Sequence, residues 1–254
     1  MSKYVKYNEC EVKINDENIF ALNASLSARS NSDANILYGG AVDSYSSAVE
    51  SQAEVSFEYY ITGEIDNIRT LTGDISCSGE FGGIKFSGAY LNNYSVTIRP
   101  YLPISFNASF AIFSGYQDTL STGSFTSDSL ELANGAHTSL TNITSSNVGM
   151  DNPQEINYSI NCLRQGNYVI GEEFPQDVRF GSVEKKLSLK GEDIGPLINF
   201  SGKDFAKISI QPRTHNNTSR GQLIECEGII NSQSLNVSKN GMVNGDIEII
   251  ERVR

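Results

Sequence analysis

The sequence has no tryptophan, and only two of its 254 residues are histidine. So few histidines leave little material for general-base catalysis. The four cysteines (Cys10, Cys77, Cys162 and Cys226) form no CxxC pair, so no zinc site is indicated. The opening residues, MSKYVKYNEC, lack the apolar run of a secretory signal or membrane span. We therefore expect reduced, structural cysteines and no membrane insertion; disulfide pairing is the alternative.

Long runs of one charge are also missing. The net charge of -11 divides almost evenly, with -6 over residues 1–115 and -5 over residues 116–254. The longest basic cluster is Lys185-Lys186, which argues against a protein that holds nucleic acid by its phosphates. An acidic chain can still lie beside DNA without adhering to it, because like charges repel.

No arrangement typical of an enzyme stands out. His137 and His215 lie in polar segments that are typical of solvated turns, and no G-x-S-x-G elbow accompanies them. The carboxylate pairs Glu172-Glu173 and Glu192-Asp193 adjoin glycines, which favours turn acids; the opposed carboxylates of a glycosidase are the alternative. Phosphate-binding, dinucleotide-binding and calcium-binding motifs are absent from the sequence. The sequence thus predicts no catalytic, cofactor-binding or metal-binding residue, and a protein that is not an enzyme.

What the sequence does contain favours strands. Ser, Asn, Gly, Ile, Tyr and Phe are abundant, and apolar residues alternate with polar ones in segments such as Glu54–Ile61. Apolar residues three or four apart occur in Ile65–Leu71 and Asp193–Phe200, where we predict one short helix each. The predicted fold class is all-β (mainly β).

Several blocks recur in the same order along the chain. The spacing between matched blocks drifts only slowly, as an insertion and a few short gaps between two copies would cause. The matched blocks are Ala24–Ser27 with Tyr158–Asn161, Tyr60–Glu64 with Ser188–Glu192, Ile84–Gly88 with Ile224–Gly228, and Ser105–Phe110 with Asn244–Ile249. This order indicates a tandem duplication of one β domain.

The duplication divides the chain into three parts. Residues 1–115 form the first β domain, residues 116–150 a linker and the start of the second copy, and residues 151–254 the second β domain. Asn240-Gly241 predicts a tight hairpin in the second copy. The long polar segments Ser27–Ser51 and Gln165–Gly181 are interpreted as equivalent loops between strands.

The last block of each copy, residues 83–98 and 223–238, resembles tail tube proteins of tailed-bacteriophage virions. The resemblance implies two tandem tail-tube-like β-sandwich or β-barrel domains, each with one short helix. It also implies a homo-oligomer of stacked trimeric, pseudo-hexameric rings that form a DNA conduit. DNA would pass through the lumen without specific binding, the two loops would reach the adjacent ring, and other virion proteins would be partners. Such a protein is located in the virion, after assembly in the host cytoplasm.

Two alternatives stay open. One is another non-enzymatic phage virion component, such as a neck, baseplate or capsid decoration protein. The other is a carbohydrate-binding or hydrolytic β-sandwich, for which Tyr94, Tyr101 and Tyr116 are the loop aromatics that could stack on sugar.

Overall fold

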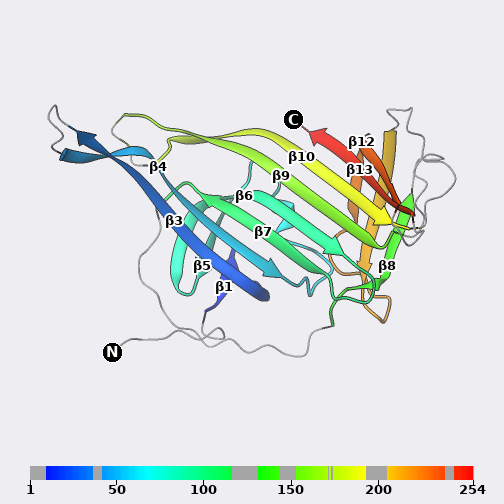
Figure 1. Ribbon diagram of the computed structural model, residues 1–254. Coiled ribbons are helices and arrows are strands. Elements are labelled where there is room, and N and C mark those ends of the chain that lie inside the picture. Colours follow the sequence, from blue (N-terminus) through cyan, green and yellow to red (C-terminus); the bar gives the residue numbers. More distant parts are fainter. Residues whose placement is uncertain are drawn as a thin grey trace.

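The computed structural model describes residues 10–36, 42–115, 131–142, 153–170, 172, 174–192, 205–237 and 243–253, with backbone alone for 30–36, 42–52 and 141–142. These residues form an all-β fold, as the composition predicts. Their 13-stranded antiparallel sheet is bent into a sandwich (Figure 1). The strands are β1 Val12–Ile14, β2 Glu17–Asn18, β3 Ala21–Ile36, β4 Val42–Tyr59, β5 Ser76–Phe81, β6 Ile84–Ile98, β7 Ser105–Ile112, β8 Asn134–Asn142, β9 Glu155–Asn167, β10 Asp177–Gly191, β11 Phe205–Arg213, β12 Ile224–Val237 and β13 Val243–Val253.

The strand order occurs twice. In the first half of the chain the neighbours are β3-β4-β7-β6-β5-β1-β2, and in the second half they are β9-β10-β13-β12-β11-β8. Each strand from β3 to β7 thus has a counterpart six strands later, and β8 takes the place of β1. The two halves meet where β6 pairs with β9. The domain boundaries given above stay predictions.

The pairing register repeats as well as the order. The β12–β13 pairs from Ile229↔Ile250 to Asn236↔Asn244 correspond one by one to the β6–β7 pairs from Tyr90↔Ala111 to Thr97↔Ser105. A β-bulge interrupts the two ladders at the same point. The pairs beside it are Leu91↔Phe110 and Asn93↔Ser109 in the first ladder, and Ile230↔Ile249 and Ser232↔Glu248 in the second.

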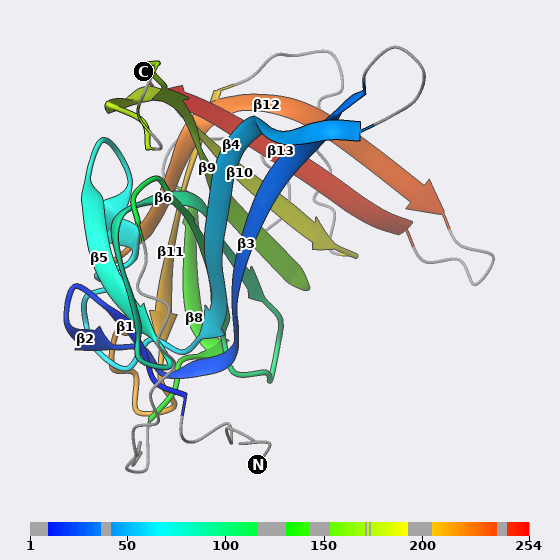
Figure 2. The same cartoon turned by 90° about the vertical axis from the view of Figure 1, so that its left-hand side faces the viewer.

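The bulge explains how one strand can belong to both layers of the sandwich. A bulge bends its strand, so the first part of β6 pairs with β5, and its last part, Asn93–Ile98, pairs with β9 along the same edge. In β12 the first part likewise pairs with β11. In Figure 2, β1, β2 and β5 lie to one side of β3 and β4. Alternate residues of both halves, such as Phe110 and Ile249, are fully buried and belong to one continuous hydrophobic core.

The register corrects two of the sequence matches. Leu26 pairs with Val55 as Tyr158 pairs with Leu187, so the counterpart of Tyr158 is Leu26 and not Ala24. Val55 corresponds to Leu187 because the two residues pair with the counterparts Phe110 and Ile249. The match of Tyr60–Glu64 with Ser188–Glu192 is therefore displaced by four residues. Both displacements are an even number of residues, because an alternating pattern is unchanged when it is shifted by two residues.

The predicted loop Ser27–Ser51 is wrong. β3 and β4 run through most of it as a long hairpin, paired as far as Ile36↔Val42, and project beyond the rest of the sheet in Figure 1. Its predicted equivalent, Gln165–Gly181, likewise contains the end of β9 and the start of β10. Polar residues on both sides of a strand leave no alternation to recognise, although the backbone ladder forms without it.

Only the first of the two helix predictions can be compared with the structure. Ile65–Leu71 ends in a single 3-10 turn, Arg69–Leu71, instead of an α-helix. Asp193–Phe200 and the predicted Asn240-Gly241 turn lie outside the described residues.

A buried carboxyl group holds the segment after β4 against the core. Asp66 is only 3% exposed and accepts hydrogen bonds from the hydroxyls of Tyr59 (3.1 Å) and Tyr94 (2.8 Å) and from the backbone N–H of Ile68 (3.1 Å). Burial raises the pKa of Asp66, partly offset by these hydrogen bonds. The folded chain therefore binds the Asp66 proton more tightly than the unfolded chain.

We predict that Asp66→Ala lowers the free energy of unfolding by about 2–4 kcal/mol in acid, because two buried hydroxyls lose their acceptor. Since the folded pKa is raised, the contribution of Asp66 is complete below its ordinary pKa of 3.8 and declines as pH rises through the folded value. Urea unfolding of both proteins at several pH values measures the difference. Asp66→Asn, which keeps an acceptor but cannot ionise, is the control. A difference that grows with pH would contradict the raised pKa.

Candidate functional site

The ladder between β6 and β9 is the candidate site, because it joins the two halves and crosses a broad polar surface. Asn93–Ile98 pairs antiparallel with Ile156–Asn161. Side chains add to the backbone bonds: Asn93 donates to Asn161 (2.5 Å) and Thr97 to Asn157 (2.8 Å). One continuous layer, β3-β4-β7-β6-β9-β10-β13-β12, therefore spans both halves.

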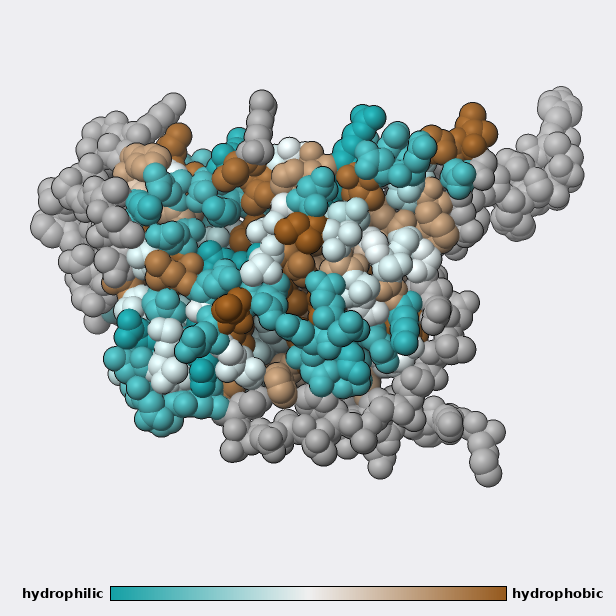
Figure 3. Space-filling model, turned by 180° about the vertical axis from the view of Figure 1, so that it is seen from behind, coloured by the Kyte–Doolittle hydropathy of each residue, from teal (hydrophilic) through white to brown (hydrophobic). Residues whose placement is uncertain are grey.

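The side of this layer that faces away from the core is polar over its central part. The alternation of each strand places there Asn23, Ser25, Ser56, Glu58, Ser105, Asn107, Ser109, Asn93, Ser95, Thr97, Glu155, Asn157, Ser159, Asn161, Lys186, Ser188, Lys190, Asp246, Glu248, Ser232 and Ser234, which we call the polar face. It carries four carboxylates and two lysines among hydroxyls and amides. Figure 3 views the molecule from behind relative to Figure 1, and the surface on that side has hydrophobic residues scattered among hydrophilic ones.

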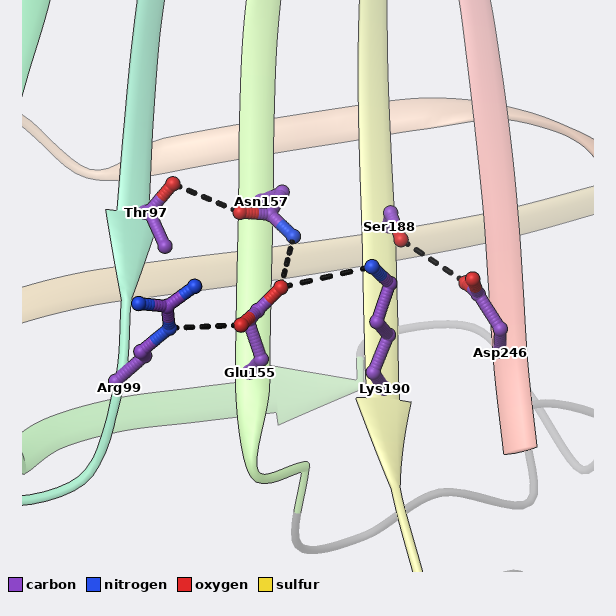
Figure 4. A network of polar contacts seen from close by, with 7 residues as sticks. All are labelled: Thr97, Arg99, Glu155, Asn157, Ser188, Lys190 and Asp246. Atoms are coloured by element: carbon purple, nitrogen blue, oxygen red, sulfur yellow. Dashed lines mark hydrogen bonds and ion pairs between the residues drawn. The ribbon is translucent and has the colours of Figure 1, made fainter. Parts of the chain in front are cut away.

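Figure 4 shows how polar contacts cross four strands of the polar face. Glu155 of β9 lies 2.7 Å from Arg99 Nε, after the end of β6, and 3.6 Å from Lys190 Nζ of β10. Asn157 also donates to Glu155 (2.8 Å). The hydrogen bonds from Asn157 and Arg99 lower the pKa of Glu155, so its carboxylate stays charged. The network fixes one register without exposing an apolar group.

Arg164 ties the other end of β9 to the first half. Its side chain is 1% exposed. The guanidinium donates to the backbone oxygens of Leu91 (3.2 Å) and Gly73 and lies 4.7 Å from the centre of the Tyr90 ring. Desolvation lowers the pKa of Arg164, and Asp74, at 3.8 Å, acts in the opposite direction. Arginine suits this position because its planar group stacks on a ring and donates in several directions.

A further arginine joins the halves through their loops. Arg69 donates to the backbone oxygen of Leu223 (2.8 Å) and lies over the ring of Tyr158 at 5.8 Å. Beside it, the N–H of Gly221 donates to the oxygen of Gly63 (3.0 Å). The joint thus combines a strand ladder with loop contacts.

Two strand edges in this layer have no neighbour among the described residues. β3 pairs only with β4. The last part of β12, Ser232–Val237, pairs only with β13, because the ladder to β11 ends at Ile229. These edges are the counterparts of the two that meet in the joint, since β3 corresponds to β9 and β12 to β6.

The cysteines lie as the sequence predicts. Cys77, Cys162 and Cys226 are buried and free, and Cys10 is half-buried and free. Burial raises the pKa of Cys77 and of Cys226 to about 12, so these thiols stay protonated.

The other predicted positions are scattered. His215 lies in an exposed turn, 3.4 Å from Glu131, as expected. His137 is exposed in strand β8 rather than in a loop. Glu172 and Glu192 are exposed, whereas their neighbours Glu173 and Asp193 lie outside the described residues.

The aromatics proposed for sugar stacking do not gather. Tyr94 lies in β6, not in a loop, and is 1% exposed, which overturns its proposed role. Tyr101 is 84% exposed after β6, and Tyr116 lies outside the described residues.

Within the described ranges, no group of three or more His, Cys, Asp or Glu side chains could hold a metal ion. The same ranges contain no helix that is long and apolar enough to cross a membrane. The sequence matches no protein-family model and no curated protein.

We predict that Arg164→Met lowers the free energy of unfolding by about 2–4 kcal/mol, because two backbone acceptors lose a charged donor in a buried place. Arg252→Met is the matched control: Arg252 is 76% exposed and pairs with Glu184, so its loss costs less than about 1 kcal/mol. Urea unfolding measures both. Equal losses in the two variants would argue that Arg164 does not tie the joint.

Proposed function

We propose that the chain is a virion structural protein without enzymatic activity, a tail tube subunit of a tailed phage. Three chains form a pseudo-hexameric ring, and stacked rings enclose a conduit through which DNA passes. Its partners are further copies of itself and other virion proteins. It assembles in the host cytoplasm and resides in the virion.

The observation that carries this proposal is the β6–β9 ladder between two halves of equal strand order. A tube built from similar domains needs a sheet that continues from one domain to the next, so that its edges are paired rather than exposed. Within one chain this continuation is present, and at either end of the same layer lies a counterpart of a joined strand whose outer edge has no partner in the described part of the chain.

The polar face suits the lumen of such a tube. It offers hydroxyls, amides and a small excess of negative charge, with each lysine paired to a carboxylate: Lys190 with Glu155 and Lys186 with Glu248. The phosphates of a DNA duplex would find no basic stripe on the polar face to hold them. The face would let DNA slide.

The two ion-paired carboxylates of the polar face do not support the opposed-carboxylate alternative. On the polar face Glu155 is paired with Arg99, and Glu248 with Lys186. A hydrolase needs one carboxyl whose pKa is raised to act as acid, but the pKa values of Glu155 and Glu248 are both lowered.

We predict that the purified protein, concentrated at near-physiological salt, forms rings or tubes in negative-stain electron microscopy. Class averages should show threefold symmetry with six similar lobes and a central hole about as wide as a DNA duplex. Stacked rings support a tube, and single rings that never stack favour a neck or baseplate component. A dispersed monomer at high concentration, confirmed by sedimentation, would contradict the proposal.

A further inference from the structure

We propose that the last part of β12 in one chain pairs antiparallel with β3 of a second copy, in a register that the β6–β9 joint dictates. The inference rests on the proposed ring assembly, because it names the strands and residues that join the chains. The partner is another copy of this chain, and the contact is head-to-tail, since the two edges belong to different strands.

The register follows from the equivalence of the two halves. The β6–β9 pairs run from Asn93↔Asn161 to Ile98↔Ile156. The repeated ladders make Ser232 of β12 the counterpart of Asn93, and Arg29 of β3 the counterpart of Asn161. Replacing each residue of the joint by its counterpart gives the predicted pairs between chains: Ser232↔Arg29, Gln233↔Ala28, Ser234↔Ser27, Leu235↔Leu26, Asn236↔Ser25 and Val237↔Ala24.

Apart from Gln233↔Ala28, the predicted pairs join residues of like polarity on each side of the layer. Leu235 and Val237 point to the core side of the layer but are 41% and 73% exposed, and the predicted ladder sets them against Leu26 and Ala24. On the polar face, Ser234 meets Ser27. Leu235 and Leu26 are the counterparts of Val96 and Tyr158, which are buried and paired in the joint.

Gln233 has an incomplete set of contacts in the single chain. Its side-chain oxygen is buried and has no hydrogen-bond partner among the residues that the structure describes. A buried amide oxygen without a partner is costly. Gln233 lies on the edge that the second copy would cover, where Ala28 is its predicted opposite residue and supplies no side-chain donor.

The two edges also lack the usual protection against pairing. Exposed edge strands commonly carry lysine, proline or an inward-pointing charge. Ser232–Val237 contains no charged residue and no proline, and the pairing segment of β3, Ala24–Arg29, contains no proline and a single charge, Arg29, at its end. Strands with these sequences at the ends of a broad sheet are suited to receive a neighbour.

Disulfide trapping tests the register. In a Cys10→Ser background, which removes the one cysteine that is not buried, a chain carrying Ser27→Cys and Ser234→Cys is treated with an added oxidant. Directly opposed residues lie about 4.5–5.5 Å apart between Cα atoms, within disulfide range. We expect denaturant-resistant dimers and trimers, about tenfold more than from the matched pair Ser25→Cys and Ser234→Cys. That control is displaced by two residues, which lengthens the distance to about 7–8 Å.

Single-cysteine chains test the direction. Chains with Ser27→Cys alone and with Ser234→Cys alone should not cross-link separately, whereas their mixture should give dimers. Dimers from either variant alone would overturn the head-to-tail contact. Rings in microscopy without the Ser27–Ser234 cross-link would overturn this register and leave the proposed function standing. Absence of both rings and cross-links would overturn both.

A charge at the edge gives an independent test. We predict that Leu235→Lys leaves the urea unfolding of the single chain within about 0.5 kcal/mol, since the side chain is already 41% exposed, but abolishes rings because the lysine would face Leu26 of the neighbour. Val253→Lys is the matched control: Val253 is 43% exposed and lies in β13, away from either edge, so rings should persist. Equal assembly of the two variants would refute the contact.

Discussion

The antiparallel ladder between β6 and β9 is the constraint on which the rest of the structure depends. It turns two sets of strands into one layer with one core, and it sets the polar face of each half side by side. Arg164 and Arg69 add contacts between the halves by donating to the backbone oxygens of Leu91 and Leu223. Because β6 must bend to serve both β5 and β9, the bulge after Leu91 is as necessary to this joint as the paired residues.

Much of the fold could be predicted from the sequence, and its errors have a physical origin. Alternation and composition predicted strands, and ordered glycine and apolar matches predicted the repeat. The match of Ser105–Phe110 with Asn244–Ile249 agrees with the observed register. The matches on β3 and β4 were displaced by two and four residues, because alternation cannot distinguish even shifts. The bulge after Leu91 shifts the alternation by one residue, so the next buried side chain is Tyr94, but a break in alternation alone does not distinguish a bulge from the end of a strand.

The candidate site was harder to predict, because it consists of strand pairings and strand edges and not of reactive side chains. The polar residues around Ser27 favour a loop, yet they form a strand that is paired on one side alone among the described residues. Tyr94 was placed in a loop, although its hydroxyl binds Asp66 inside the core. A strand edge is defined by the neighbours it has, and only the assembled sheet reveals which edges remain free.

The β6–β9 ladder has a mechanical consequence. In the proposed ring, six lateral seams alternate between two kinds: three lie inside a polypeptide and are closed when it folds, and three form by collision between chains. Dilution or heat below the unfolding temperature would open only the second kind. The ring would therefore come apart into three equal sectors and not into six, and a tube of such rings would have three lines of weakness along its length.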